Sequence, residues 1–298
     1  MESAETGVAD ASPLHALRFR PPYAWEAMLA FLEARTIAGV EMRDGPVFRR
    51  SLSLVREGLV HRGCIEVSLV PGQHALGVTV PESLVPVLSD VVARVAHVFD
   101  VACDPAAIVH SLGPLAADAP GLRVPGVFDG FEAGVRAIAG QQVSVRAMAI
   151  LLSRIAARYG APLAAPESGL AVTFPDAATL ARVPVEALAS LGMPRTRART
   201  IVTLAAAVVD GLELRPGVDV ESTLARLLAL PGIGPWTAQY IAMRGLGWRD
   251  AFLHSDLGVN KALGETRPAR VLAQAEAWRP WRAYAVIHLW DSQRKRPT

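Results

Sequence analysis

The chain has 298 residues, of which 51% are hydrophobic and 19% are charged, so it is long enough for two or three domains with buried cores. Its net charge of +2 is too small to indicate a nucleic-acid partner by itself, and its apolar runs fall short of the roughly 18 residues that a membrane span needs. Two cysteines are too few for a disulfide framework or a cysteine-bound cluster, and the seven histidines show no metal-binding spacing. These features predict a cytoplasmic protein without a membrane segment.

The N-terminal third is predicted to form a mixed α/β domain. Residues 1–12 carry three acidic side chains and lack the basic segment of a secretory signal, so they are predicted to be a disordered tail. Residues 25–32 and 84–98 have the apolar spacing of helices. Residues 47–54, 64–69 and 76–80 are rich in strand-forming side chains, with a turn at Pro71-Gly72. The predicted domain spans residues 13–105.

The remaining residues, 106–298, are predicted to be helical. Pro114, Pro120 and Pro125 interrupt a stretch that looks like a linker. Helices are then predicted at 131–139 and onward to 159, and at 184–190, 195–209, 223–230, 235–244 and 281–290. The chain is therefore predicted to belong to the α+β class.

The segment from Leu230 to Ala238 is typical of a tight hairpin between two helices. Gly232 and Gly234 can adopt backbone angles that a side chain forbids, and Pro235 suits the first turn of a helix. The free N–H groups and the positive dipole end of such a helix bind anions, and a DNA phosphate is the natural candidate. Two other interpretations remain. One is a dinucleotide-binding loop, which the preceding helical segment disfavours, and the other is a plain helix–helix turn.

A carboxylate follows the hairpin in the segment Phe252-Leu253-His254-Ser255-Asp256. A fixed carboxylate stabilises the positive charge that develops on a sugar when its bond to a nucleobase breaks. The structural alternative is that Asp256 only caps the helix that follows it. Together, the hairpin and the carboxylate indicate an enzyme that acts on DNA.

Several ordered blocks of the sequence are similar to one known family. They are Arg20-Pro21-Pro22-Tyr23-x-Trp25, Gly121-Leu122-Arg123-x-Pro125-Gly126, Phe131-Glu132-x-Gly134-Val135-Arg136-Ala137-Ile138-x-Gly140-Gln141, Leu191-Gly192-Met193-Pro194, the hairpin, Phe252-Leu253 and Arg279-Pro280-Trp281-Arg282-x-Tyr284-Ala285. In these blocks the chain resembles the helix-hairpin-helix-GPD superfamily of DNA glycosylases, and within it the AlkA type, 3-methyladenine DNA glycosylase II. The resemblance implies a TATA-binding-protein-like α/β domain at the N-terminus. It also implies an all-α helix-hairpin-helix glycosylase body of two lobes, with the active cleft between them and the hairpin at residues 228–240.

The resemblance implies that Asp256 is the catalytic residue, because it falls at the position of the family's essential aspartate. The family often has a second acid just before this position, where the chain has Ser255. It also has bulkier residues after this position, where the chain has Leu257-Gly258. These departures are expected to change the electrostatics of the pocket around the carboxylate.

The scarcity of lysine bears on the type of reaction. Relatives that also cut the DNA strand attack the sugar with a lysine in the second helix of the hairpin, and the chain has Trp236 in that place. Lys261 and Lys295 are the only lysines among the 30 basic residues. The sequence therefore predicts a glycosylase without lyase activity.

The resemblance places Trp236, Tyr240 and Trp290 in the pocket that holds the target base. Trp236 and Tyr240 are four residues apart, so they lie on one face of a helix. Electron-rich rings favour a cationic alkylated purine by stacking and by cation–π attraction of about 0.5–2 kcal/mol per contact. The alternative is that these rings are ordinary core aromatics.

The resemblance assigns Gln141 and Gln142 to the loop that fills the gap left by an extruded base. The AlkA type is known for a leucine wedge, where this chain has Gln142. A glutamine is a poorer apolar wedge but can hydrogen-bond the orphaned partner base. The alternative is a polar junction between two helices.

Further contacts are predicted around the hairpin. The predicted phosphate-binding residues are Gly232, Gly234, Thr237, Arg195 and Arg197, although a solvated arginine face is an equal alternative for the arginines. By analogy with the family, a Na⁺ or K⁺ ion would bind the backbone carbonyls of Leu228, Leu230 and Ile233.

The function predicted from this resemblance is excision of alkylated purines, of the 3-methyladenine type, from double-stranded DNA, leaving an abasic site. The expected partner is DNA that contains alkylated bases, with no required cofactor and no obligate protein partner. One alternative keeps the fold but changes the lesion to uracil or a deaminated purine. The other is a hairpin module that binds DNA without catalysis.

Overall fold

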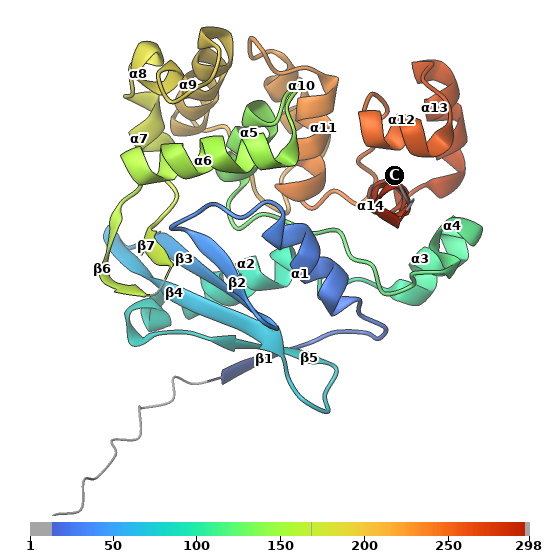
Figure 1. The fold of residues 1–298 in the computed structure, drawn as a ribbon, viewed down its shortest axis with the longest axis horizontal. Coiled ribbons are helices and arrows are strands. Elements are labelled where there is room, and N and C mark those ends of the chain that lie inside the picture. The colour runs from blue at the N-terminus through green and yellow to red at the C-terminus, as the bar shows by residue number, and fades with distance from the viewer. Residues whose placement is uncertain (1–13, 168, 296–298) are drawn as a thin grey trace, which may run out of the picture.

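The computed structural model describes residues 14–167 and 169–295, so the predicted tail lies outside the described residues (Figure 1). The N-terminal part contains an antiparallel five-stranded sheet in the order β1-β5-β4-β3-β2. Its strands are β1 (Leu14–Arg18), β2 (Glu41–Asp44), β3 (Val47–Arg56), β4 (Leu59–Leu69) and β5 (Ala75–Thr79). The predicted strands correspond to β3, β4 and β5. The two strands that the sequence analysis missed, β1 and β2, form the edges of the sheet, where a short strand depends on its neighbour for pairing.

Three helical segments complete this part: α1 (Trp25–Glu33), the 3₁₀ helix η1 (Glu82–Val87) and α2 (Leu88–Val98). Met28 and Leu29 of α1 share one buried core with Val91 and Val95 of α2 and with the inward side chains of the sheet. In Figure 1, α1 lies beside the strands of the sheet and α2 runs behind them. The helices α1 and α2 therefore belong to the core of the sheet domain.

The helical part forms two groups. Its segments are α3 (Pro105–Leu112), α4 (Pro114–Ala117), α5 (Gly130–Ala139), α6 (Val145–Tyr159), α7 (Ala177–Ala181), α8 (Val185–Ala189), α9 (Arg195–Val209), α10 (Val220–Leu228), α11 (Pro235–Arg244), α12 (Leu257–Leu263), α13 (Pro268–Ala275), η2 (Glu276–Trp278) and α14 (Arg282–Lys295). Figure 1 shows α5 to α11 in one group, and α3, α4 and α12 to α14 in the other. The helices predicted after residue 130 are confirmed.

Two local features of the second part differ from the sequence analysis. The predicted linker contains α3 and α4, because Pro105 and Pro114 stand in the first turns of these helices, where a missing N–H costs nothing. A two-stranded sheet, β6 (Pro162–Glu167) and β7 (Leu170–Val172), lies within the region expected to be helical. Leu163 and Leu170 pack against Cys64 of the sheet domain, so this pair is stabilised by tertiary contact rather than by local sequence.

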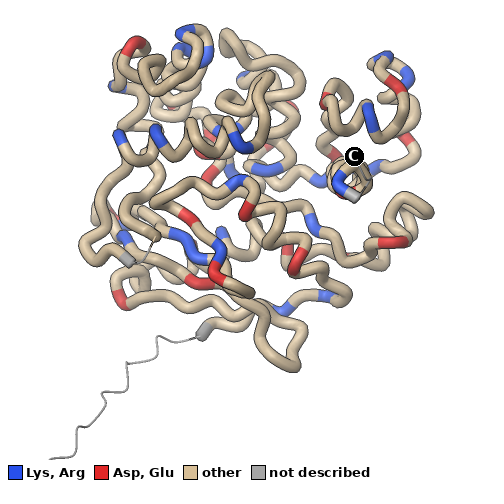
Figure 2. The backbone as a smooth tube through the Cα atoms, in the orientation of Figure 1, with Lys and Arg blue, Asp and Glu red and all other residues tan. Residues whose placement is uncertain are grey.

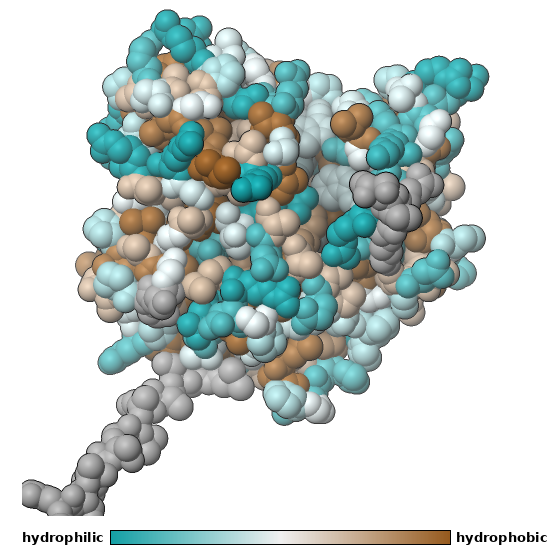
Figure 3. Space-filling view, in the orientation of Figure 1, coloured by the Kyte–Doolittle hydropathy of each residue, from teal (hydrophilic) through white to brown (hydrophobic). Residues whose placement is uncertain are grey.

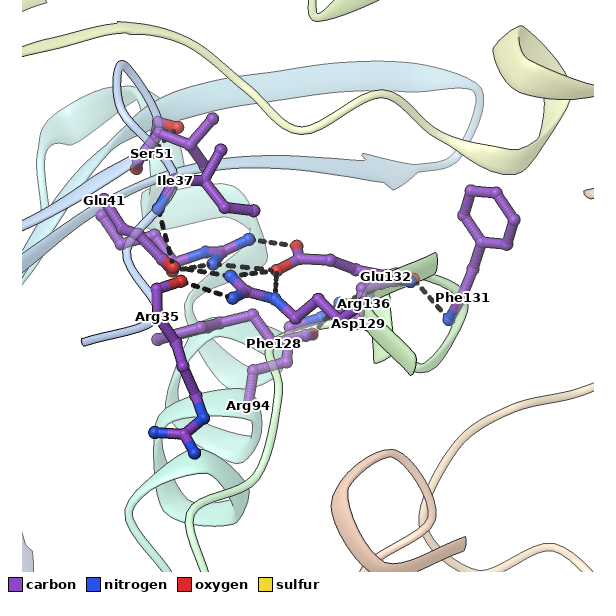
Figure 4. Close-up of polar contacts among 12 residues, drawn as sticks. Arg35, Ile37, Glu41, Ser51, Arg94, Phe128, Asp129, Phe131, Glu132 and Arg136 are labelled. Atoms are coloured by element: carbon purple, nitrogen blue, oxygen red, sulfur yellow. Dashed lines mark hydrogen bonds and ion pairs between the residues drawn. The ribbon is translucent and has the colours of Figure 1, made fainter. Parts of the chain in front are cut away.

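A buried cluster of four charges joins the two parts. Arg50 of β3 pairs with Glu41 of β2 and with Glu132 of α5, and Arg136 of α5 pairs with the same two carboxylates at 2.6 and 2.8 Å. Figure 4 shows Glu132 and Arg136 facing Glu41 across the domain boundary. Burial alone would raise the pKa of Glu132, but the two guanidinium groups lower it. The cluster thus carries two positive and two negative charges.

Acidic and basic residues are interspersed over the backbone in Figure 2, in keeping with the small net charge. Within residues 14–167 and 169–295, no helix combines the length and the apolar character needed to cross a membrane.

Candidate active site

Asp256 lies immediately before α12, in extended backbone conformation with φ −73° and ψ 131°. One of its carboxylate oxygens, Oδ1, accepts a hydrogen bond from the backbone N–H of Val259 at 3.0 Å, so Asp256 caps the helix. The side chain is partly exposed, and the preceding Ser255 is exposed. The capping role that the sequence suggested is therefore present, and it leaves the second oxygen, Oδ2, available for other contacts.

Two indole rings converge on this carboxylate from different helices. Nε1 of Trp236, in the first turn of α11, donates to Oδ2 of Asp256 at 3.0 Å. Nε1 of Trp290, in α14, donates to Oδ1 at 2.8 Å. The structure therefore brings together the predicted catalytic residue and two of the predicted pocket residues.

Four aromatic rings stand beside the carboxylate in two stacked pairs. Trp236 stacks on Tyr240 with ring centroids 5.3 Å apart and an interplanar angle of 27°. Trp290 stacks on Phe31 of α1, at 6.2 Å and 19°. Tyr240 is buried, whereas Trp236 and Trp290 are partly exposed. The sheet domain therefore supplies Phe31 to a site otherwise built from the helical part.

Two arginines flank these rings. The guanidinium of Arg35 lies 3.7 Å from the ring centroid of Phe31, and that of Arg244 lies 4.9 Å from the same ring. Burial lowers the pKa of Arg35 to about 10, so the group still carries its charge at neutral pH. Burial alone would raise the pKa of the Tyr240 hydroxyl, but the positive charge of Arg244, whose Nη1 donates to that oxygen at 2.5 Å, lowers it. The aromatic site therefore lies in a positive field.

A cavity of about 220 Å³ opens between α1 and α14 next to these groups. Phe31, Arg35, Trp290 and Arg294 are among the residues that line it. The space-filling view shows a notch between the two helical groups on one face of the molecule (Figure 3).

Phe31 and Arg35 were not predicted to belong to the site, although the family motif Arg20 to Trp25 lies close to them in the sequence. More than 200 residues separate them from Asp256, so no local spacing could have paired them. The charge cluster fixes their placement, because Nη1 of Arg136 donates to the backbone carbonyl of Arg35 at 2.8 Å. In Figure 4 the side chain of Arg35 points away from that cluster.

The predicted hairpin connects α10 to α11. Gly232 has φ +89°, and a Cβ atom at this position would lie 2.0 Å from Oγ1 of Thr200 in α9. Only glycine meets both conditions. Gly234 precedes α11, Pro235 occupies the first position of the helix, and a Cβ on Gly234 would meet no protein atom within 4 Å.

The predicted wedge loop, residues 140–143, is hydrogen-bonded to this hairpin. Nε2 of Gln141 donates to the carbonyl of Gly232 at 3.1 Å and to Oγ1 of Thr237 at 3.0 Å. Nη2 of Arg197 donates to the carbonyl of Gln141 at 2.6 Å. Gln142 is exposed, with φ +55°. The side chain of Gln141 is thus engaged within the protein, and that of Gln142 faces solvent.

The remaining predicted contacts are also placed. Arg195 is exposed and pairs with Glu186. The carbonyl of Leu230 accepts from the N–H of Ile233 at 3.1 Å, and the side chain of Leu228 is exposed. In the described part of the chain, no three or more His, Cys, Asp or Glu side chains are placed to hold a metal ion.

Comparison with known proteins decides the family. The model of the AlkA N-terminal domain matches residues 15–129, and the model of the HhH-GPD superfamily base excision DNA repair protein matches residues 135–281. DNA-3-methyladenine glycosylase 2 of Escherichia coli is 38% identical over 286 residues, which cover 95% of this chain and 99% of that protein. The chain belongs to the AlkA family of HhH-GPD base excision DNA repair proteins. The resemblance seen in the sequence is therefore confirmed.

Other AlkA-family and HhH-GPD proteins agree with this assignment. The probable bifunctional transcriptional activator/DNA repair enzyme AlkA of Mycobacterium tuberculosis is 39% identical over 93% of this chain, which spans 56% of that longer protein. The 3-methyladenine DNA glycosylase from Archaeoglobus fulgidus has the same fold, with a TM-score of 0.77, 20% identity, and coverage of 94% of this chain and 98% of that one. The α+β fold class is confirmed by these likenesses.

Proposed function

We propose that this protein is a monofunctional DNA glycosylase that flips alkylated purines, of the 3-methyladenine type, out of double-stranded DNA and excises them, leaving an abasic site. The observation that supports this most directly is the carboxylate of Asp256, which stands between two stacked aromatic pairs and follows a glycine hairpin. The cap of α12 uses only Oδ1, so capping alone does not account for the two indole N–H groups that donate to the carboxylate. DNA is the proposed partner, and no protein partner or cofactor is needed for the reaction.

The proposed reaction begins with base flipping. Phosphates of the damaged strand would bind at the hairpin near Gly232 and Gly234, where the start of α11 favours an anion. Gln142, exposed on its loop, would fill the space that the base leaves. The base would then stack on the aromatic rings beside Asp256. Arg197 already donates to the backbone of the wedge loop. We therefore propose that its main role is to hold this loop, and not to bind a phosphate directly.

The chemical step is breakage of the bond between C1′ of deoxyribose and the base. The bonding electrons leave with the alkylated base. The positive charge of this base already makes it a good leaving group. The negative charge of Asp256 stabilises the cationic sugar until water adds to C1′ and loses a proton. Electrostatic stabilisation of this type typically contributes a factor of about 100 to 1,000 to a rate.

Base release from methylated duplex DNA tests this proposal. We expect the wild-type protein to release 3-methyladenine and Asp256→Asn to lose about 100-fold or more of the single-turnover rate, because the charge is removed while the amide retains its size. Gel assays should show abasic sites without strand cleavage, and borohydride should trap no covalent adduct, since Trp236 occupies the lyase position. An unimpaired Asp256→Asn variant would refute the catalytic role, and a trapped adduct would refute the monofunctional assignment.

A second candidate substrate is a deaminated purine. Arg35 and Arg244 place positive charge beside Phe31, which opposes a cationic base and favours one with an exocyclic carbonyl oxygen. The same assay distinguishes the two candidates when duplexes that contain hypoxanthine are compared with methylated duplexes. Faster release of hypoxanthine would favour the second candidate.

We propose that a structural Na⁺ or K⁺ ion binds the backbone carbonyls of Leu228, Leu230 and Ile233. Neutral carbonyl oxygens in a turn suit a monovalent cation. Ile233 lies between Gly232 and Gly234, so these carbonyls belong to the hairpin itself. The ion would therefore stabilise the hairpin rather than take part in the reaction.

A further inference from the structure

The carboxylate of Asp256 accepts N–H groups from three different elements. Oδ1 accepts from Val259 of α12 and from Trp290 of α14, and Oδ2 accepts from Trp236 of α11. Each distance lies between 2.8 and 3.0 Å, within the usual range for N–H···O hydrogen bonds. Both oxygens are therefore held, and rotation of the carboxylate would break at least one indole bond.

We propose that Trp236 and Trp290 are positioning residues that act on the reaction through their N–H groups, and not only as stacking surfaces for the base. This inference rests on the proposed function of Asp256. A partly exposed aspartate has several rotamers, and only some direct its charge at the sugar. Two indoles fixed in separate helices restrict it to one. Their rings stack on Tyr240 and Phe31, so the donors are themselves held in place.

Gly258, the second residue of α12, supports this interpretation. A Cβ atom at this position would lie 3.1 Å from Cδ1 of Trp290 and 3.2 Å from Oδ1 of Asp256. These contacts are closer than normal van der Waals distances, so a side chain would press on both partners of the same hydrogen bond. Alanine is the better helix former, yet the chain has glycine where the indole meets the carboxylate. The missing side chain lets Trp290 reach Asp256.

The test removes the N–H groups and keeps aromatic rings. Trp290→Phe and Trp236→Phe are measured for the single-turnover rate of base release from methylated duplex DNA, and for the Kd of a duplex with an abasic-site analogue. We expect each variant to lose about 10- to 100-fold in rate, as for a lost hydrogen bond to a charged group, with Kd within about twofold of wild type. Trp248→Phe, at a half-buried tryptophan away from Asp256, is the matched control and should keep the wild-type rate.

A rate within twofold of wild type in both variants, or a rate loss matched by equally weaker DNA binding, would overturn the inference. Gly258→Ala keeps both tryptophans and provides an answer if a phenylalanine variant fails to fold. We expect its melting temperature to be no lower than wild type and its rate to fall at least fivefold; an unchanged rate would count against the inference. A wild-type protein that released no base would instead refute the proposed function itself.

Discussion

At the scale of single residues, the two glycines of the hairpin have different reasons to be glycine. Gly232 has positive φ and lies against Thr200, whose Oγ1 donates to the carbonyl of Pro231 at 3.2 Å. Its lack of a side chain serves the fold. Gly234 has ordinary φ of −96° and open space where a Cβ would be. The fold itself does not require glycine at position 234. We propose that bound DNA occupies the space beside it.

Alanine at each position should separate these two roles. Gly232→Ala should lower the free energy of unfolding by about 2–3 kcal/mol, because the chain must relieve both the backbone strain and the contact with Thr200. Gly234→Ala should leave stability within about 0.5 kcal/mol but weaken duplex binding. Urea unfolding and fluorescence anisotropy with an abasic duplex measure the two effects. Equal stability losses in both variants would contradict this division.

At the scale of elements, the loop between α5 and α6 and the hairpin between α10 and α11 behave as one unit. Gln141 links them through its side chain, and Arg197 of α9 holds the loop through its backbone. Gln142, the next residue, is exposed to solvent. The position of the proposed wedge residue is therefore linked to the hairpin that we propose binds phosphate.

Methionine has a shape similar to glutamine and lacks its amide, so it tests this linkage. Gln141→Met should lower the free energy of unfolding by about 1–2 kcal/mol, since two hydrogen bonds are lost, and should reduce the preference for abasic over undamaged duplex. Gln142→Met should leave stability unchanged while affecting only the binding preference. Thermal melts and competition binding provide the measurements. A preference that survives intact in Gln141→Met would show that the wedge is positioned independently of the hairpin.

At the scale of the whole molecule, Asp100 joins the sheet domain to the last helix. It follows α2 and accepts from the hydroxyl of Tyr284 in α14 at 2.7 Å and from the N–H of Val124 at 3.3 Å. Asp100 and His97 both line a cavity of about 1070 Å³ along the boundary between the two parts. Burial raises the pKa of Asp100 from its usual 3.8 to about 6.

This shift makes the stability of the protein depend on pH. The folded state keeps the proton of Asp100 up to about pH 6, whereas the unfolded chain loses it near 3.8, so the stability contribution falls as pH rises between these values. Asp100→Asn keeps a carbonyl acceptor, and asparagine tolerates the positive φ of 47° at this position. We expect the variant to be more stable than wild type by about 1–3 kcal/mol near neutral pH, with the gain shrinking as the pH is lowered toward about 4. Urea unfolding across this range measures it, and a gain that does not vary with pH would exclude Asp100 as its source.

The sequence predicts those parts of this structure that depend on local pattern. α10, apart from its first turn, follows from apolar spacing, and α11 follows from apolar spacing and from Pro235 at its start. Asp256 follows from its place after the hairpin together with the family resemblance. The contacts of Phe31 with Trp290 and with Arg244 join separate domains. The hydrogen bonds from two indoles to one carboxylate depend on angles between helices. Neither kind of contact can be predicted from the spacing of residues in the sequence.

Helix α1 has a consequence for how such a protein can change over evolutionary time. The proposed catalytic acid, Asp256, and its indole partners are encoded in the last quarter of the chain, whereas Phe31, which stacks on Trp290, is encoded in the first eighth. We therefore expect substitutions along α1 to change which bases the proposed site accepts while Asp256 keeps its hydrogen bonds. The charge cluster would hold the backbone after α1 in place through Arg136 and Arg35 when side chains on α1 change. Base selectivity and catalytic rate could then evolve separately.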